Sequence, residues 1–376
     1  MSSHPYHNAI PIPGTDADVS VQIVVPARNE EDCIGRCLES LVQQQGIGLA
    51  ITVVNDSSSD GTRAVAESFS GVRVIDAPEP APGVSGKCNA LIYGAKNAKA
   101  KWLLFTDADT VHYPGSLARA VAEAEAREVD LLSYSPEQET GSWAEMALLP
   151  VVFADLARTY PPGRVNDPNY PTAAANGQYL LVRREVYESL GGHKAVADKI
   201  LEDVELARLF KVSHYPVWFR QGTGLVSARM YRSFPAMVAG WTKNLVLLFQ
   251  YPLLLAARRA FEFLAIGGLA AAAVLALIHA SYFEVAVFAS GSLVVSGLFW
   301  WRVRQAHFPF LASLLSFFGV PMFAWLLLRS WWHMRVRGAV TWKGRTYTRF
   351  RTHTEAFSAP RPPADSSIPR SSESKS

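Results

Sequence analysis

Residues 101–110 read KWLLFTDADT, an apolar run that ends in two carboxylates, Asp107 and Asp109. Trp102 and Phe105, with two leucines between them, are typical of an interior strand. A strand does not explain the acids, because two like charges one residue apart repel each other and lose hydration on burial. A divalent cation with oxygen ligands would hold both carboxylates and leave positions open for phosphates. A polar turn is the alternative, since Asp is common where strands end.

The composition divides the 376 residues into a mixed part and an apolar part, enough for one large domain and a second element. Residues 1–240 resemble a soluble α/β protein, whereas residues 245–328 are far more apolar. The net charge of +3 favours no nucleic-acid partner. Three cysteines, Cys33, Cys37 and Cys88, do not suggest a disulfide framework, and residues 1–18 lack the apolar core of a signal peptide. We therefore expect the mixed part to stay in the cytoplasm.

Short strands alternate with helices through the first part of the chain. We expect strands at residues 21–26, 50–56, 72–76 and 102–105, with a helix after each of them. Asn29 is expected to cap the first helix, whose apolar stripe is Ile34, Cys37, Leu38 and Leu41. This order predicts an α/β fold with a mostly parallel, mixed sheet and helices on both faces.

Polar side chains follow several of these strands, where parallel sheets bind ligands. Arg28 and Asp56 follow the first two strands, and Asp107 and Asp109 follow the fourth. Asp56 could accept hydrogen bonds from a base or ribose, or cap a helix. Lys87, which follows Gly86 at a predicted helix start, suits a diphosphate, although an exposed lysine would look the same. The chain has no G-x-G-x-x-G and no Walker sequence, which disfavours dinucleotide binding and ATP hydrolysis.

Further polar groups occur downstream. Residues 142–156 are apolar and aromatic, and predict either an interfacial helix or a core helix. Glu202 and Asp203 open a predicted helix, where acids are favoured by the helix dipole. Arg229 and Arg232 are expected on one helix face, where they could clamp phosphates or lie as surface cations.

Taken in order, the motifs VVPARNEE, VVNDSSSDGT, GKCNAL, FTDADT, LEDVELA and RMYR resemble family 2 glycosyltransferases of the A-type fold, over about residues 20–245. The sequence WKGR at residues 342–345 resembles the branch that glycosylates lipids, such as carotenoid, hopanoid-type and ceramide glucosyltransferases. The resemblance implies inverting transfer of a sugar from a UDP-sugar to a lipid hydroxyl, with Mg²⁺ or Mn²⁺ as cofactor. Transfer to a polyprenyl phosphate, a processive polysaccharide synthase and a non-catalytic nucleotide-sugar binding protein are the alternatives.

The resemblance also implies roles for single residues. Asp56 would hold the uridine, Asp107 and Asp109 would bind the metal, and Asp203 would be the catalytic base. The nucleotide-sugar side is expected to comprise Pro26, Arg28, Glu30, Asp56, Lys87, Asp107, Arg229 and Arg232. The acceptor side is expected to comprise Asn176, Gly177, Gln178, Glu202 and Trp241. Ser233 stands where the family motif (Gln/Arg)-x-x-Arg-Trp has Trp, which argues against a processive synthase.

The expected organisation is a flexible N-terminus (1–18), a cytoplasmic catalytic domain (19–244), an interfacial helix (245–257), a membrane region (258–351) and a disordered tail (352–376). Residues 261–279 and 285–301 are each long enough to span a bilayer. Basic residues flank only the outer ends of this pair, so we expect a hairpin in the inner membrane with both ends cytoplasmic.

A third apolar segment, residues 308–328, is interrupted by Gly319 and Pro321. A third span would place the cations that follow it, Arg329, Arg335 and Arg337, outside the cell. A re-entrant hairpin would keep these cations in the cytoplasm and is the form we expect.

Overall fold

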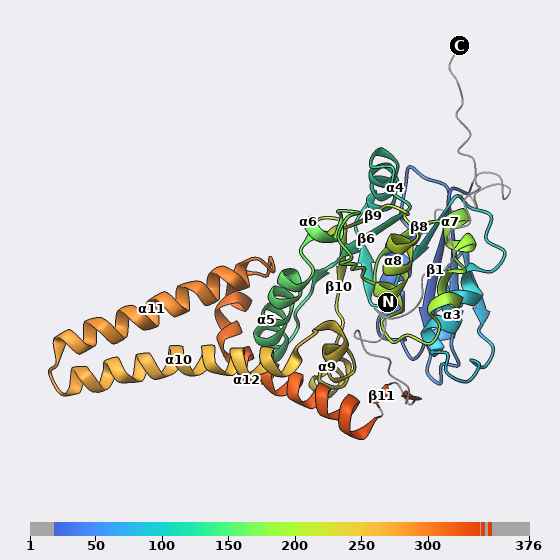
Figure 1. The fold of residues 1–376 in the computed structure, drawn as a ribbon. Helices are drawn as coiled ribbons and strands as arrows, with labels where there is room; N and C mark the ends of the chain where they lie inside the picture. The colour runs from blue at the N-terminus through green and yellow to red at the C-terminus, as the bar shows by residue number, and fades with distance from the viewer. Residues whose placement is uncertain (1–18, 339, 343–344, 348–376) are drawn as a thin grey trace, which may run out of the picture.

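The computed structural model describes residues 19–338, 340–342 and 345–347. At its centre is a seven-stranded sheet of order β3-β2-β1-β4-β8-β6-β9 (Figure 1). Its strands are β1 Val21–Ala27, β2 Leu49–Asn55, β3 Val72–Asp76, β4 Trp102–Phe105, β6 Leu131–Ser135, β8 Leu180–Arg183 and β9 Val217–Gln221. Strand β8 runs antiparallel to β4 and β6, and the other pairings are parallel. The predicted α/β class with a mixed, mostly parallel sheet is therefore confirmed.

Helices cover both faces of this sheet. One face packs against α1 Ile34–Val42, α2 Thr62–Glu67 and α4 Ser116–Ala126. The other packs against α3 Gly86–Ala95, α7 Arg184–Ser189, the 3₁₀ turn Gly192–Val196 and α8 Glu202–Val212. Strand β4 lies in the middle of the sheet and all of its side chains are buried, as its apolar sequence predicts. The acids that follow β4 therefore emerge at the centre of the sheet's carboxyl edge.

The predicted stripe of helix α1 is confirmed, but its predicted cap is wrong. Ile34, Cys37, Leu38 and Leu41 are the buried residues of α1. The helix begins five residues after Asn29, and Asn29 instead adopts a positive φ of 53° in the turn after β1. Its side-chain oxygen accepts a hydrogen bond from the backbone N–H of Ser59 at 2.9 Å, so it ties two carboxyl-end loops together.

A small second sheet brings a distant segment to the acids. Strand β10 Val226–Ala228 pairs with β5 Thr110–His112 and β7 Glu137–Gln138. The pairing places Arg229 beside Asp109, whose carbonyl accepts a hydrogen bond from the Arg229 backbone N–H at 3.3 Å. The expected helix carrying Arg229 and Arg232 is wrong, because both lie in irregular chain between β10 and α9 Phe234–Leu248.

Helix α5, Trp143–Thr159, is a core helix rather than an interfacial one. It packs on α12 Phe310–Trp332. Five of its buried residues, Ala144, Leu148, Leu149, Val151 and Val152, belong to a third hydrophobic cluster shared with α9 and the C-terminal helices. The short helix α6 Pro162–Val165 follows it in the loop at residues 161–171. The core alternative for residues 142–156 is thus the correct one.

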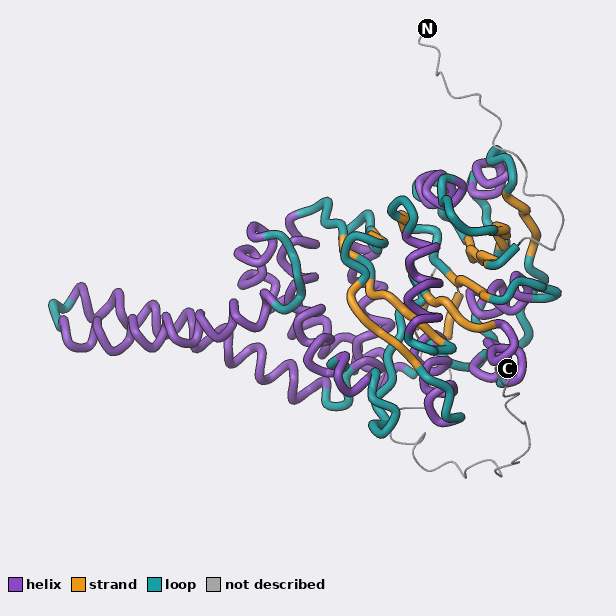
Figure 2. The backbone as a smooth tube through the Cα atoms, turned by 90° about the horizontal axis from the view of Figure 1, so that it is seen from above, coloured by secondary structure: helices purple, strands orange, loops and turns teal. Residues whose placement is uncertain are grey.

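The expected interfacial helix at residues 245–257 is not one helix. Helix α9 ends at Leu248, and α10 Pro252–Ile278 begins after a short break. Helix α10 and α11 Tyr282–Arg304 then form a long hairpin that projects from the domain (Figures 1 and 2). Both helices are long and apolar enough to cross a membrane.

The expected re-entrant hairpin at residues 308–328 is wrong, since α12 is one continuous helix. Gly319 does not make a turn there. A Cβ at Gly319 would lie 2.0 Å from the backbone oxygen of Ala147, so the glycine lets α12 approach α5 closely. By length and composition α12 is also a candidate span, together with the π-turn His333–Arg337 that follows it. The short strands β11 Val340–Trp342 and β12 Arg345–Tyr347 end the described chain, and the expectations for residues 1–18 and 352–376 lie outside the described residues.

Candidate active site

One cavity of about 540 Å³ lies at the carboxyl edge of the large sheet. Every residue that the sequence singled out for the site lines this cavity. They come from β1 and the loop after it, the loops after β2, β4 and β10, the loop before β8, and helices α3, α8 and α9. These residues are Pro26, Arg28, Glu30, Asp56, Lys87, Asp107, Asp109, Asn176, Gly177, Gln178, Glu202, Asp203, Arg229, Arg232 and Trp241. The fold thus brings together side chains that are far apart in sequence.

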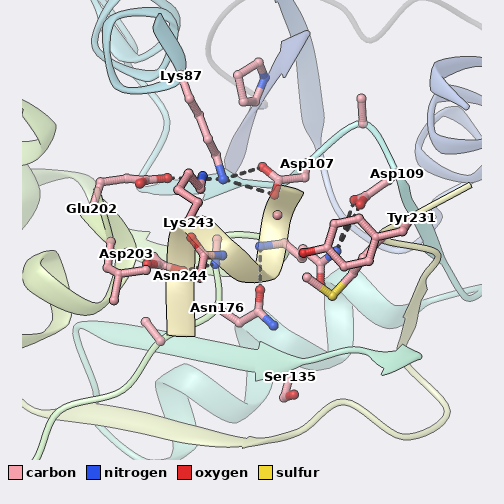
Figure 3. Close-up of a pocket in the computed structure, with 18 of the residues that line it drawn as sticks. Lys87, Asp107, Asp109, Ser135, Asn176, Glu202, Asp203, Tyr231, Lys243 and Asn244 are labelled. Atoms are coloured by element: carbon pink, nitrogen blue, oxygen red, sulfur yellow. Dashed lines mark hydrogen bonds and ion pairs between the residues drawn. The ribbon is translucent and has the colours of Figure 1, made fainter. Parts of the chain in front are cut away.

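Lys87 joins two of the acidic groups (Figure 3). Its ammonium lies 2.8 and 3.0 Å from the two carboxylate oxygens of Asp107 and 3.1 Å from Glu202. Burial alone would lower the pKa of Lys87, but the surrounding carboxylates, Asp107 first, raise it well above its usual value. Lys87 is therefore a fixed positive charge at the start of helix α3, whose Ser85 cap accepts a hydrogen bond from the Cys88 N–H. A helix start with such a charge suits a phosphate.

Asp109 lies on the other side of Asp107 from Glu202 (Figure 3). The amide nitrogen of Gln178 donates to both of its carboxylate oxygens at 3.2 Å. Burial, and next the negative charge of Asp107, raise the pKa of Asp109 to about 7. The pair therefore carries more negative charge than its neighbours compensate, which favours an added cation.

A hard divalent cation fits these groups. Asp107 and Asp109 supply carboxylate oxygens, and the buried amide oxygen of Gln178 has no hydrogen-bond partner in the part of the chain that the structure describes. Among the described residues no three His, Cys, Asp or Glu side chains form a cage for a metal ion. Cations that are shared with substrate phosphates need only one or two protein carboxylates, so the donor set suits that kind of binding.

Asp203 is held differently from the other acids. Its two oxygens accept hydrogen bonds from the backbone N–H groups of Gly177 at 2.7 Å and Val204 at 2.8 Å. Burial, and next the charge of Glu202, raise its pKa to about 6. This carboxyl group is therefore fixed in position and poised to exchange a proton near neutral pH.

Two of the cavity's arginines, Arg28 and Arg229, lie beside acids. The Arg28 guanidinium donates to the backbone oxygen of Asp56 at 3.0 Å and lies 3.8 Å from its carboxylate. Arg229 lies 3.7 Å from the buried carboxylate of Glu145 on α5, across the backbone of Gly141. A Cβ at Gly141 would overlap the Arg229 guanidinium, so this glycine makes room for it.

An apolar wall completes the cavity on the side of helices α5 and α9. Helix α5 contributes Phe153, Leu156 and Ala157. Helix α9 contributes a stripe at helical spacing that includes Ala236, Gly240 and Leu248. Two of the expected acceptor residues, Gln178 and Glu202, instead contact Asp109 and Lys87.

Sequence analysis missed Lys243 and Asn244, which line the cavity beside Asp203 (Figure 3). Burial lowers the pKa of Lys243. Their position on the α9 stripe was the available signal, because both lie three to four residues after Gly240. Trp241 is buried nearby, and its indole N–H has no hydrogen-bond partner among the described residues.

Comparisons with known proteins find relatives of part of the chain. Residues 22–191 match the family described as "Glycosyl transferase family 2". The 4,4'-diaponeurosporenoate glycosyltransferase of Staphylococcus aureus (strain MRSA252) is 33% identical over 235 residues, which are 60% of each chain. The present chain thus spans 60% of the length of that relative.

Two solved structures are also among the matches, at low sequence identity. The mannosyltransferase PcManGT from Pyrobaculum calidifontis, in complex with GDP-Man and Mn²⁺, is 19% identical with a TM-score of 0.46, covering 88% of this chain and 90% of that one. Glucosyl-3-phosphoglycerate synthase from Mycobacterium tuberculosis is 20% identical with a TM-score of 0.39, covering 63% and 82%.

Proposed function

We propose that this chain is a family 2 glycosyltransferase that transfers a sugar from a UDP-sugar to the hydroxyl group of a lipid at the membrane surface. The observation that carries this proposal is the single cavity that holds both a charged end and an apolar wall. A nucleotide-sugar needs the charged end, and a lipid acceptor needs the apolar wall. The wall is built from α5 and α9, which pack on the C-terminal apolar helices.

The donor would bind along the carboxyl edge of the sheet. Asp56, beside Arg28, would hold the uridine, and Pro26 and Glu30 would line the same end. Lys87 would lie against the diphosphate, with Arg229 and Arg232 adding positive charge on the opposite side. These cations would stabilise the negative charge that develops on the leaving UDP.

Asp107 and Asp109 would hold Mg²⁺ or Mn²⁺, both of which favour oxygen ligands. When bound, such an ion neutralises charge on the diphosphate and so makes UDP a better leaving group. Gln178 keeps Asp109 oriented through its amide hydrogen bonds. Lys87 must release part of its contact with Asp107 if that carboxylate is to bind the cation.

Asp203 would act as the general base. Its carboxylate would take the proton of the acceptor hydroxyl as the oxygen attacks the anomeric carbon from the face opposite UDP, which inverts that centre. The backbone N–H groups of Gly177 and Val204 fix the carboxylate in one orientation. Asn176 and Trp241 would line the acceptor side of the reacting centre.

A lipid carboxylate is the second candidate acceptor. The name of the Staphylococcus aureus relative denotes a carboxylate substrate, and Lys243 supplies a cation beside Asp203 at the inner end of the apolar wall. A carboxylate or a polyprenyl phosphate is already ionised and needs no base. Transfer that survives Asp203→Asn but is weakened by Lys243→Met would favour an anionic acceptor over a hydroxyl.

The basic ends of the α10–α11 hairpin favour a cytoplasmic catalytic domain. Arg258 and Arg304 flank the hairpin on the domain side, whereas residues 279–284, at its far end, contain no Lys or Arg. The proposed location is the inner membrane, with the cavity facing the cytoplasm.

The test is incubation of the purified chain in liposomes with radiolabelled UDP-sugars and a bacterial lipid extract. We expect label to move into the organic phase with one sugar, in step with UDP release. Label that stays in the aqueous phase with every sugar and every lipid fraction would contradict lipid glycosylation.

A further inference from the structure

Helix α12 has two unlike faces, which sets it apart from the α10–α11 hairpin. Of the most apolar stretch of α12, 50% is buried against protein, compared with 11% in α10 and 6% in α11. The exposed residues recur at helical spacing and form one apolar stripe. This stripe comprises Phe310, Leu314, Phe318, Trp325, Leu328 and Trp332.

The opposite face of α12 is attached to the catalytic domain along its whole length. Near its start, Phe308 lies 5.8 Å from Phe153 of α5, measured between ring centroids. At its middle, Gly319 touches the backbone of α5. Near its end, the Ser330 hydroxyl accepts a hydrogen bond from the Val246 N–H of α9 at 2.9 Å. Helix α12 therefore follows the underside of α5 and α9, as Figure 1 shows.

This attachment conflicts with α12 crossing a bilayer. Helices α5 and α9 carry the polar cavity on their other side, so a crossing α12 would draw charged groups such as Lys243 toward hydrocarbon. The domain end of the hairpin gives a second indication of how deep the helices lie in the membrane. There Asp155 of α5 lies 2.8 Å from Arg259 of α10 and 3.2 Å from Arg302 of α11. These charged side chains favour a position of the domain end of the hairpin outside the hydrocarbon core of the bilayer.

Exposed cations accompany the stripe. Arg258 and Arg304 lie at the domain ends of α10 and α11, and Arg335 and Arg337 follow α12. Together with Trp325 and Trp332 on the stripe, these residues have the chemistry that binds the boundary between anionic headgroups and acyl chains.

We propose that α12 lies in the plane of the membrane, with its apolar stripe immersed in the lipid layer that faces the catalytic domain, and that only α10 and α11 cross the bilayer. The stripe then continues the lipid contact of the hairpin, and the described end of the chain stays on the same side as the catalytic domain. The bilayer surface lies directly beneath α5 and α9, the helices that form the apolar wall of the cavity. This arrangement does not depend on which reaction the cavity catalyses.

The first test uses single cysteines and a membrane-impermeant maleimide on intact and permeabilised cells. Glu79→Cys reports the catalytic domain, His279→Cys the far end of the hairpin, and Val336→Cys the chain after α12. The native cysteines are buried, so the unmodified chain gives the background. We expect the labels at positions 79 and 336 to share one side and the label at 279 to lie on the other. Position 336 on the side of 279, or all three on one side, would overturn the proposal.

The second test measures depth along the stripe. Spin labels at Leu314, Phe318, Trp325 and Leu328 are read in liposomes of phosphatidylglycerol and phosphatidylcholine by collision with oxygen and with a nickel chelate. An in-plane helix places them at one shallow depth. A crossing helix separates the first and last by about 21 Å. Labels on α11 at Tyr282 and Leu293 serve as the control for a crossing helix. A graded depth, or labels with no lipid contact because a second copy covers the stripe, would overturn the proposal.

Discussion

The acids of the cavity carry the same charge but are compensated in different ways. Asp107 has a lysine ammonium within 3.0 Å on both of its oxygens, whereas Asp109 accepts hydrogen bonds from a neutral amide. Asp203 has two backbone N–H groups, which orient it without neutralising it. These differences are the physical basis for the proposed roles, a cation-binding pair and a separate general base. The sequence alone could not predict these contacts, because Gly177 and Gln178, which donate hydrogen bonds to Asp203 and Asp109, lie in a loop that is distant in sequence.

The proposed base sets an expectation for pH dependence. The pKa of Asp203 is raised to about 6 by burial and by Glu202. Because a base must be ionised, kcat/KM for transfer should fall about tenfold per unit as the pH drops below 6. The sign for stability is opposite: a carboxyl group whose pKa is raised by folding stabilises the fold most at low pH, and that contribution is lost as pH rises through 6. The measurement is a rate profile from pH 5 to 8 at saturating metal, and a flat profile would remove Asp203 from the role.

At the scale of elements, regular periodicity made the sheet and its helices predictable. The runs at residues 21–26 and 102–105 are apolar in the way that buried parallel strands require, and both are strands. Segments whose structure depends on distant partners were not predictable. Arg229 and Arg232 have helical spacing, yet the pairing of β10 with β5 places Arg229 beside Asp109 in irregular chain. Gly319 and Pro321 read as a turn, because sequence does not distinguish a glycine that turns from one that lets helices touch.

The α5–α12 contact gives a prediction at this scale. A Cβ at Gly319 would lie 2.0 Å from a backbone oxygen, which cannot move away as a side chain could. Gly319→Ala should therefore lower the free energy of unfolding by about 1–3 kcal/mol. Gly297→Ala on α11 is the matched control, since nothing lies within 4 Å of that position. Thermal unfolding in detergent measures both variants, and equal midpoints would contradict the close contact.

At the scale of the whole molecule, the fold places a cavity with charged side chains next to the apolar C-terminal helices. The α/β domain opens its cavity at the carboxyl edge of the sheet, and α5 and α9 connect that cavity to the C-terminal helices. The Asp155, Arg259, Glu262 and Arg302 network joins the domain to the hairpin through buried ion pairs. This connection favours a rigid placement of the cavity relative to the bilayer.

Removal of divalent cations tests how the acidic pair works. With Asp107 and Asp109 facing a diphosphate and no cation between them, like charges would repel the donor. A chelator should therefore abolish both UDP-sugar binding and transfer, and added Mn²⁺ or Mg²⁺ should restore both. Calorimetric titration of UDP-sugar with and without metal is the measurement. Undiminished binding in the presence of chelator would show that Lys87 and the arginines suffice.

The most direct test of the proposed cation-binding role of Asp109 and base role of Asp203 compares Asp109→Asn with Asp203→Asn. Both variants are measured in the same two assays, UDP-sugar binding and single-turnover transfer to lipid. We expect Asp109→Asn to weaken metal-dependent binding at least tenfold. We expect Asp203→Asn to bind the donor as the unmodified chain does and to lose transfer by at least a hundredfold. Normal transfer by Asp203→Asn, or unchanged binding by Asp109→Asn, would contradict the account.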